Sequence, residues 1–174
     1  MEIVLNLIDK TPYLEWNEYE STIDKDEPFY CKNIPSIKTI QNSGCNCAGL
    51  INILHLSRGL IVPGVISNYY YAGGTYAWFE YLNSINRLEL ICENKNYPAG
   101  SLLLRKYRNP DDQGHLAVLY TSGNILEQKL LHSYRGPGIK IDNTVRESHN
   151  WINGGYYEYI CINWLNTNLE SCDF

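Results

Sequence analysis

The chain has 174 residues, and its 14 Lys and Arg against 19 Asp and Glu give a formal net charge of −5. With 44% hydrophobic and 13% aromatic residues, the composition is typical of a folded domain with a substantial core. The acidic balance and the lack of a basic run argue against a nucleic-acid partner, because phosphate contacts need clustered Lys and Arg.

No apolar run approaches the roughly 18 residues that a membrane span requires, so we expect no membrane partner. The first ten residues lack the basic start and apolar core of a secretory signal. The abundance of Asn, Ile and Tyr is typical of an AT-rich coding sequence, as in some microbes and large DNA viruses. We therefore expect a cytoplasmic or virion-associated protein, and the sequence does not define its oligomeric state.

Neither a repeat nor a low-complexity linker divides the chain, so we expect a single domain over residues 1–174. Residues 1–40 combine short apolar stretches with turn signals and predict an irregular segment that wraps the core. The apolar spacing of residues 47–58 predicts the first substantial helix, which Gly59 ends. Either Ser43 or Asn46 is suited to cap its start.

A second helix is expected to begin at Thr75, directly after the turn formed by Gly73 and Gly74. Beyond it the pattern changes to short apolar runs bounded by turn residues, which indicates strands. The predicted strands are 88–91, 101–107, 115–120, 125–131 and 156–162, with turns at 98–100, 121–124 and 136–138. Helices followed by strands predict an α+β domain in which N-terminal helices pack on an antiparallel sheet.

Cys47 is the candidate nucleophile, because it is expected in the first turn of the helix over 47–58. A thiol has a pKa of about 8.5, and a helix N-terminus or a neighbouring imidazolium lowers it. We therefore expect Cys47 to be partly thiolate near neutral pH. Cys45 competes for this role, but it lies before the helix and suits a redox partner or a packed turn residue.

His115 is the candidate base, since it opens the apolar strand 115–120 directly after Gly114. The other interpretation is a surface histidine at a strand edge. A third group should orient the imidazole, and the following strand offers Glu127 or, nearer its end, His132. The register of the hairpin is not determined by the sequence, so both remain candidates.

The string Asn-Cys-Ala-Gly-Leu over residues 46–50 resembles the Asp-Cys-Ser-Gly-Leu motif of NlpC-type cell-wall peptidases. Residues 98–102 and 114–118 resemble the Pro-Gly-Asp-Leu and Gly-His-Val-Gly strands of the same family, in the same order. The Leu-Glu-Gln string around Glu127 is similar to one in the related CHAP amidases, which use a glutamate as the third group. The resemblance covers about residues 41–131, and it implies a papain-like core.

The same resemblance implies a role for Gln41, six residues before Cys47. Papain-like proteases place a glutamine at this spacing, where it stabilises the oxyanion of the reaction. An ordinary loop glutamine is the alternative, with the backbone N–H of Cys47 as the donor. The chain departs from the NlpC pattern at Asn46, Ala48 and Lys129, which stand where Asp, Ser and the asparagine of the CHAP string are expected.

These features predict a cysteine amidohydrolase or peptidase that cleaves peptide or isopeptide amides through a thioester, without a cofactor. Peptidoglycan peptides are the target that the resemblance implies. The alternative is a catalytically inactive relative that binds peptides or serves as a virion structural protein. A zinc site built from Cys31, Cys45, Cys47 and His55 is a further rival, although one Cys-x-Cys pair is poor zinc spacing. We therefore predict no metal site.

Overall fold

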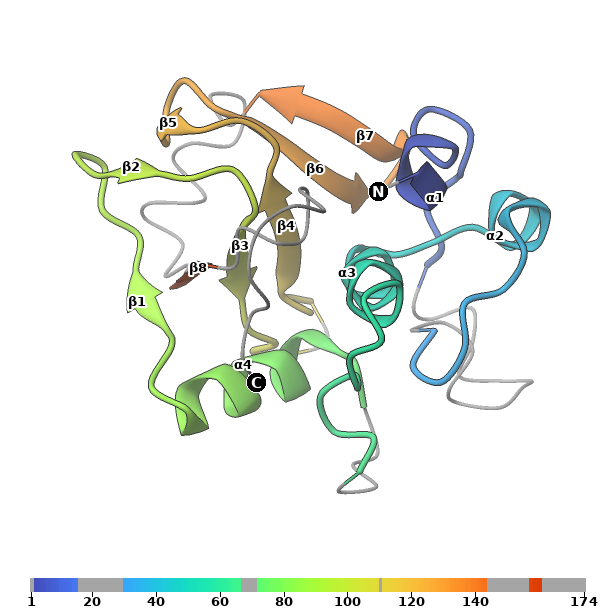
Figure 1. The fold of residues 1–174 in the computed structure, drawn as a ribbon, viewed down its shortest axis with the longest axis horizontal. Helices are drawn as coiled ribbons and strands as arrows, with labels where there is room; N and C mark the ends of the chain where they lie inside the picture. Colours follow the sequence, from blue (N-terminus) through green and yellow to red (C-terminus); the bar gives the residue numbers. More distant parts are fainter. Residues whose placement is uncertain (1, 16–29, 67–71, 110, 144–156, 161–174) are drawn as a thin grey trace.

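The computed structural model describes residues 2–15, 30–66, 72–109, 111–143 and 157–160 (Figure 1). Four helices occur in these ranges: α1 (Glu2–Leu5), α2 (Ile37–Ser43), α3 (Cys47–Leu56) and α4 (Thr75–Ser84). The strands are β1 (Glu89–Leu90), β2 (Asn96–Tyr97), β3 (Ser101–Arg105), β4 (His115–Leu119), β5 (Gly123–Asn124), β6 (Lys129–Tyr134), β7 (Gly138–Asn143) and β8 (Tyr157–Ile160). The predicted α+β class is confirmed.

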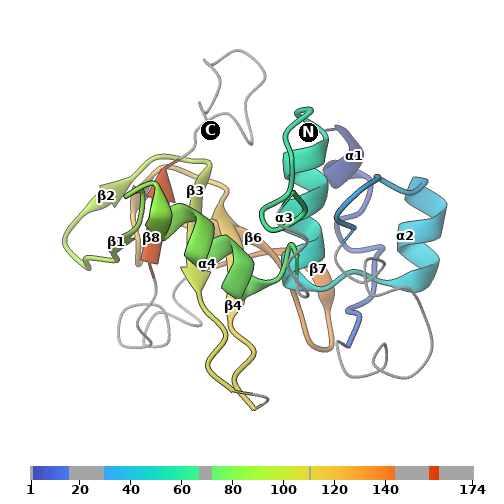
Figure 2. The ribbon, with the colours of Figure 1, turned by 90° about the horizontal axis from the view of Figure 1, so that it is seen from below.

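The strands form a six-stranded antiparallel sheet in the order β1-β8-β3-β4-β6-β7, and β2 pairs with β5 in a separate ribbon. Strands β3, β4, β6 and β7 follow one another as neighbours, and β8 returns to lie between β1 and β3. Helix α3 packs against β4 and β6, whereas α4 packs against β3. Figures 1 and 2 both show α2 farther from the sheet, beyond α3.

Helix α3 begins where its sequence predicts, because the side chain of Asn46 caps it by accepting a hydrogen bond from the Gly49 N–H at 2.7 Å. All residues from Cys47 to His55 are buried, so the helix is enclosed on every side. A polar contact joins it to α4, since Trp78 Nε1 donates to Asn52 Oδ1 at 2.8 Å. These contacts fix the start of α3 relative to the sheet.

The two faces of the sheet belong to different apolar clusters. The face toward α3 and α4 carries Leu102, Leu104, Leu116, Val118, Leu131 and Ile139. The opposite face carries Leu103, Ala117, Leu119 and Leu130, packed on Ile91, Tyr97 and Ile125. Side chains alternate between the two faces along each strand. The face of any strand residue therefore follows from its neighbours in the register.

The N-terminal region is more ordered than the predicted irregular wrap, because it contains α1 and α2 within its described part. The stretch after α1 adds to the sheet region: Asp9 N–H donates to the Ile139 carbonyl at 2.9 Å, and Ile139 N–H donates to the Thr11 carbonyl at 3.1 Å. A parallel bridge then joins Tyr13 to Cys45. This stretch therefore holds the chain that leads into Cys47.

Three sheet predictions need correction. The expected strand 125–131 is a turn followed by β6, because Asn124 Oδ1 accepts from the Leu126 N–H and the Asn124 carbonyl accepts from the Glu127 N–H, both at 2.9 Å. The expected turn over 121–124 contains β5, which pairs with β2. Strand β7 begins at Gly138, the last residue of the turn predicted over 136–138, and continues to Asn143 through residues with no predicted element; it pairs with β6 along its full length.

Candidate functional site

Cys47 is the first residue of α3, and the chain on either side of it is firmly held. Ser133 on β6 donates from Oγ to the Cys45 carbonyl at 2.5 Å, while the Cys45 N–H donates to the Pro12 carbonyl at 3.0 Å. Cys47 retains 7% of its surface exposed, whereas Cys45 has none. The preference for Cys47 as nucleophile is therefore consistent with access.

The thiol of Cys47 lies against backbone amides rather than against an imidazole. The N–H groups of Leu116, Ala48 and Cys47 itself, together with the charge of Arg105, act to lower its pKa. Burial outweighs them and raises the pKa of the Cys47 thiol above its usual value. The expected thiolate near neutral pH is therefore wrong for this state of the protein, because the helix N-terminus does not offset desolvation.

His115 and His132 form a hydrogen-bonded pair, with Nε2 of His115 3.0 Å from Nδ1 of His132. Their rings meet edge to face at 5.3 Å between centroids, and the ring of Tyr134 lies 4.4 Å from that of His132. His132 is 1% exposed, and its Nε2 has no hydrogen-bond partner among the described residues. The second of the two candidates for the third group is therefore the one in contact with His115.

Both imidazoles are held neutral at neutral pH. Burial lowers the pKa of His132 to about 4, although Asp142 acts to raise it. Burial lowers the pKa of His115 well below its usual value, and the charges of His132 and Arg105 lower it further. A neutral imidazole carries one proton, so each ring of the pair has one donor nitrogen and one acceptor nitrogen.

The register shows how the thiol and the imidazole are arranged. Ala117 pairs with His132, and Leu116 belongs to the face that packs on α3. Alternation along β4 and β6 therefore assigns His115 and His132 to the opposite face. The thiol contacts the Leu116 amide at the point where the pairing of β4 with β6 ends. The thiol of Cys47 and the imidazole of His115 therefore belong to different faces of the sheet, and the Leu116 amide that contacts the thiol directly follows His115 in β4.

Glu127 lies at the other end of the same hairpin. It is exposed, and it belongs to the turn that precedes β6. Since Leu119 pairs with Leu130, Glu127 falls beyond the end of β4 that is remote from His115. The structure does not bring Glu127 to His115, because the turn begins at Asn124 and shifts the second strand toward the C-terminus.

Gln41 lies in α2 and uses its amide elsewhere. Its Nε2 donates to the Asn6 carbonyl at 3.0 Å, which ties α2 to the N-terminal segment. The donors at the Cys47 thiol are backbone amides instead. The structure therefore supports the alternative in which the helix start, and not Gln41, supplies the oxyanion donors.

The four rival zinc ligands have separate partners. Cys31 Sγ donates to the Ala72 carbonyl at 3.0 Å, Cys45 Sγ to the Asn46 carbonyl at 3.3 Å, and His55 Nε2 lies 3.1 Å from the Ile61 carbonyl. Within the described ranges, no group of three or more His, Cys, Asp or Glu side chains is arranged to hold a metal ion. Cys31, Cys45, Cys47 and Cys92 are free thiols.

Arg105 is the site residue that sequence reasoning missed. It ends β3, pairs with His115 in the sheet register, and its charge reaches both the Cys47 thiol and the His115 imidazole. Its side chain forms an ion pair with Asp112 in the loop before β4. The only signal in the sequence is a polar loop between two predicted strands, and the register that pairs Arg105 with His115 cannot be derived from it.

The chain was compared with family models, with curated proteins and with solved structures, and none of the three comparisons found a match. Among the helices that the structure describes, none is long and apolar enough to cross a membrane. The functional argument therefore depends on the residues themselves.

Proposed function

We propose that the protein is a cysteine amidohydrolase or peptidase in which Cys47 is the nucleophile, His115 the base and His132 the group that orients the base. The observation that carries this proposal is the position of the Cys47 thiol, at the start of α3 and against the amide of Leu116. Leu116 directly follows His115, whose ring is already bonded to His132.

The bond between the histidines fits two arrangements of their protons, and only one of them suits a base. If His115 Nε2–H donates to His132 Nδ1, then His115 Nδ1 carries the lone pair that can accept a proton. The opposite arrangement would leave His115 protonated at Nδ1 and unable to act as a base. Catalysis therefore requires the first tautomer, in which His132 keeps its own proton on Nε2.

The raised pKa of Cys47 and the lowered pKa of His115 favour a neutral pair over a preformed thiolate and imidazolium. The reaction then resembles serine hydrolysis: His115 takes the thiol proton as Sγ attacks the amide carbonyl, and an S–C bond forms. The proton passes to the leaving nitrogen as the C–N bond breaks. Water, deprotonated by His115, releases the acid from the thioester and the proton returns to Cys47.

Negative charge on the carbonyl oxygen needs donors, and the start of α3 provides them. Asn46 occupies the Gly49 N–H, so the earlier amides of Cys47 and Ala48 are the ones directed at the thiol. Such donors, and the positive end of the helix, act where charge develops during attack.

The substrate class follows from the resemblance to NlpC and CHAP enzymes, which implies peptide or isopeptide amides, including those of peptidoglycan. A papain-like core is part of the same proposal. It is supported by a helix that starts at the nucleophile and packs against a strand that starts at the base. A cytoplasmic or virion-associated location remains part of the proposal.

A catalytically inactive peptide-binding or virion structural protein is the second candidate, and one observation favours it. The hydrogen-bond partners of the Cys47 thiol among the described residues are backbone amides, and its pKa is raised. A thiol that never reaches the imidazole would be a packed residue of the helix start.

Digestion of a peptide library separates the two candidates. The purified chain is incubated with linear peptides and with γ-glutamyl and lysyl isopeptides, and mass spectrometry identifies new termini. The proposal expects cleavage by wild type and by Cys45→Ser, and none by Cys47→Ser or His115→Gln. Cleavage that survives Cys47→Ser, or bound but intact peptides with wild type, would contradict it.

A further inference from the structure

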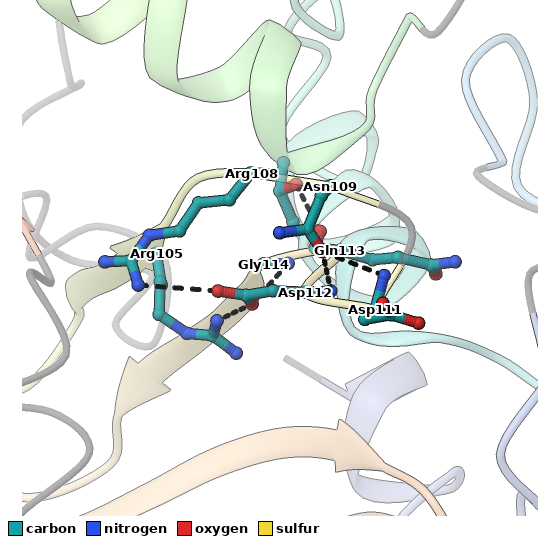
Figure 3. A network of polar contacts seen from close by, with 8 residues as sticks. Arg105, Arg108, Asn109, Asp111, Asp112, Gln113 and Gly114 are labelled. Carbon is teal, nitrogen blue, oxygen red and sulfur yellow. Dashed lines mark hydrogen bonds and ion pairs between the residues drawn. The ribbon is translucent and has the colours of Figure 1, made fainter.

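A polar network occupies the hairpin that joins β3 to β4, and it extends to Gly114, the residue before His115 (Figure 3). Arg105 forms an ion pair with Asp112, and Arg108 lies 3.5 Å from the same carboxylate. The side chains of Arg105 and Asp112 are each 24% exposed, whereas Arg108 is 48% exposed. The inner pair is therefore the more shielded from solvent.

We propose that Arg105, anchored by Asp112, is a positioning residue that holds positive charge beside the His115 imidazole. The catalytic use of this charge rests on the proposed function, whereas the contacts of Arg105 with its neighbours do not depend on it. Arg105 and His115 are cross-strand partners, so their side chains share a face and an end of the sheet.

The loop is built to keep this arrangement rigid. Asn109 Oδ1 accepts from the N–H groups of Asp111 and Asp112, both at 2.9 Å. At Gly114, φ is +80° and a Cβ would overlap the Arg105 carbonyl oxygen and lie 2.8 Å from Thr75 Oγ1. Only glycine allows the chain to approach β3 this closely before His115.

Asp112 links the guanidinium to the start of β4. Its Oδ1 pairs with Arg105 and also accepts from the Gly114 N–H at 3.4 Å. On the other side of the loop, Thr75 Oγ1 donates to the Gln113 carbonyl at 2.8 Å, which fixes the loop to the start of α4. An ion pair and two hydrogen bonds therefore link the guanidinium, the start of β4 and the start of α4.

The position of the charge has an electrostatic consequence. The Arg105 guanidinium lowers the pKa of Cys47 and also lowers the pKa of His115. It thereby opposes the effect of burial on the thiol and favours the neutral form of the imidazole at neutral pH. A positive charge at this distance also favours the oxyanion over the neutral carbonyl.

Other titratable groups near Cys47 and His115 lie on β6, on β7 and in the N-terminal segment. His132 on β6 faces His115, with Asp142 on β7 acting on His132. Tyr13 faces the thiols, and burial raises its pKa, so it stays neutral. Arg105 is thus the permanent positive charge that acts on both members of the Cys47–His115 pair.

The test measures protonation and thiol reactivity without a substrate. Ring ¹³C and ¹⁵N shifts of His115 are followed against pH by NMR in wild type, Arg105→Gln and Arg108→Gln. The alkylation rate of Cys47 by iodoacetamide is followed in parallel. Arg108→Gln is the matched control, because Arg108 shares Asp112 but does not act on the pair.

We expect Arg105→Gln to move the titration of His115 to higher pH and to slow the alkylation of Cys47 at pH values below the pKa of its thiol, with Arg108→Gln unchanged. Arg105→Lys should restore much of both effects, because it keeps the charge. Should the single variant not fold, Arg105→Gln with Asp112→Asn removes both charges and leaves no lone buried charge. The same shift is expected in it.

An unchanged His115 titration in Arg105→Gln, or an equal shift in Arg108→Gln, would overturn the inference. Either result would leave the proposed hydrolase untouched, because neither readout involves peptide cleavage. Conversely, a protein that cleaves no peptide can still show the shift, and would then retain the inference about Arg105 while losing the proposed function.

Discussion

Nε2 of His115 and Nδ1 of His132 share a hydrogen bond of 3.0 Å that joins two neighbouring strands, β4 and β6. The bond orients the imidazole of His115 edge to face against that of His132. A catalytic base needs such a third group to hold its ring, as in catalytic triads. This relationship identifies which residues to change.

Replacing His132 should disturb His115, whereas replacing Glu127 should not. His132→Leu removes the partner of a buried ring nitrogen, and we expect a loss of about 1–3 kcal/mol in the free energy of unfolding together with slower peptide cleavage. His132→Asn should rescue part of both losses, because its side-chain oxygen replaces Nδ1. Urea unfolding and cleavage rates are measured, and equal effects of Glu127→Gln and His132→Leu would refute the assignment.

Stability should fall with acidity through the histidines. Their pKa values are lowered in the folded state, to about 4 for His55 and His132 and well below the usual value for His115, because burial disfavours the charged form of all three. Between pH 6.5 and 4 the unfolded chain therefore binds protons that the folded chain does not, and stability is lost as pH falls. His55 and His132 should each account for about 2 kcal/mol between pH 7 and pH 5.

Urea titrations at several pH values check this dependence. The slope should be smaller in His132→Asn than in wild type, because one of the depressed groups is removed. A free energy of unfolding that stays constant or increases toward pH 5 would show that the histidines are not buried as described.

The cap of α3 should matter for reactivity as well as for stability. Asn46→Ala removes a cap and is expected to cost about 1 kcal/mol. Ser36→Ala removes the corresponding cap of α2, where Ser36 Oγ accepts from the Thr39 N–H at 3.1 Å, and should cost a similar amount. Only Asn46→Ala should also slow the alkylation of Cys47. Equal reactivity of the two variants would mean that the start of α3 does not act on the thiol.

Two glycines with positive φ separate steric overlap from backbone strain. Gly136→Ala meets nothing within 4 Å and should cost about 1–2 kcal/mol from its φ of +92° alone. Gly114→Ala adds an overlap with Arg105 and should lose on the order of 3 kcal/mol or more. Thermal unfolding compares them, and equal losses would show that β3 does not approach Gly114 closely.

The sequence predicted the elements whose signals are local. Asn46 and a run of apolar residues define α3, and the apolar strand after Gly114 defines β4, which begins at His115 as expected. The predicted range of the second hairpin strand, 125–131, was wrong. The side chain of Asn124 accepts a hydrogen bond from the Leu126 N–H and forms a turn, although the residues that follow have the composition of a strand. Composition alone does not fix where a turn ends.

Cys47 and His115 were proposed from their residue types and chain order, which resemble a cysteine-peptidase pattern, and the pairing of their side chains stays a prediction. The choice between Glu127 and His132 depended on register, which the structure supplies through the Ala117–His132 pair. The predicted thiolate was wrong because burial is a tertiary property that a helix N-terminus does not reveal. Arg105 was missed for a related reason, since its importance comes from the strand opposite it.

The most direct test of the central claim is acylation of Cys47 by p-nitrophenyl acetate, followed through p-nitrophenolate release and mapped by mass spectrometry. We predict a burst that acetylates Cys47, persists in Cys45→Ser and Glu127→Gln, and is lost in His115→Gln. Because general-base attack needs the imidazole, loss in His115→Gln is the informative result. Acetylation that is equally fast without His115, or that spreads over the other free cysteines, would contradict a Cys47–His115 pair.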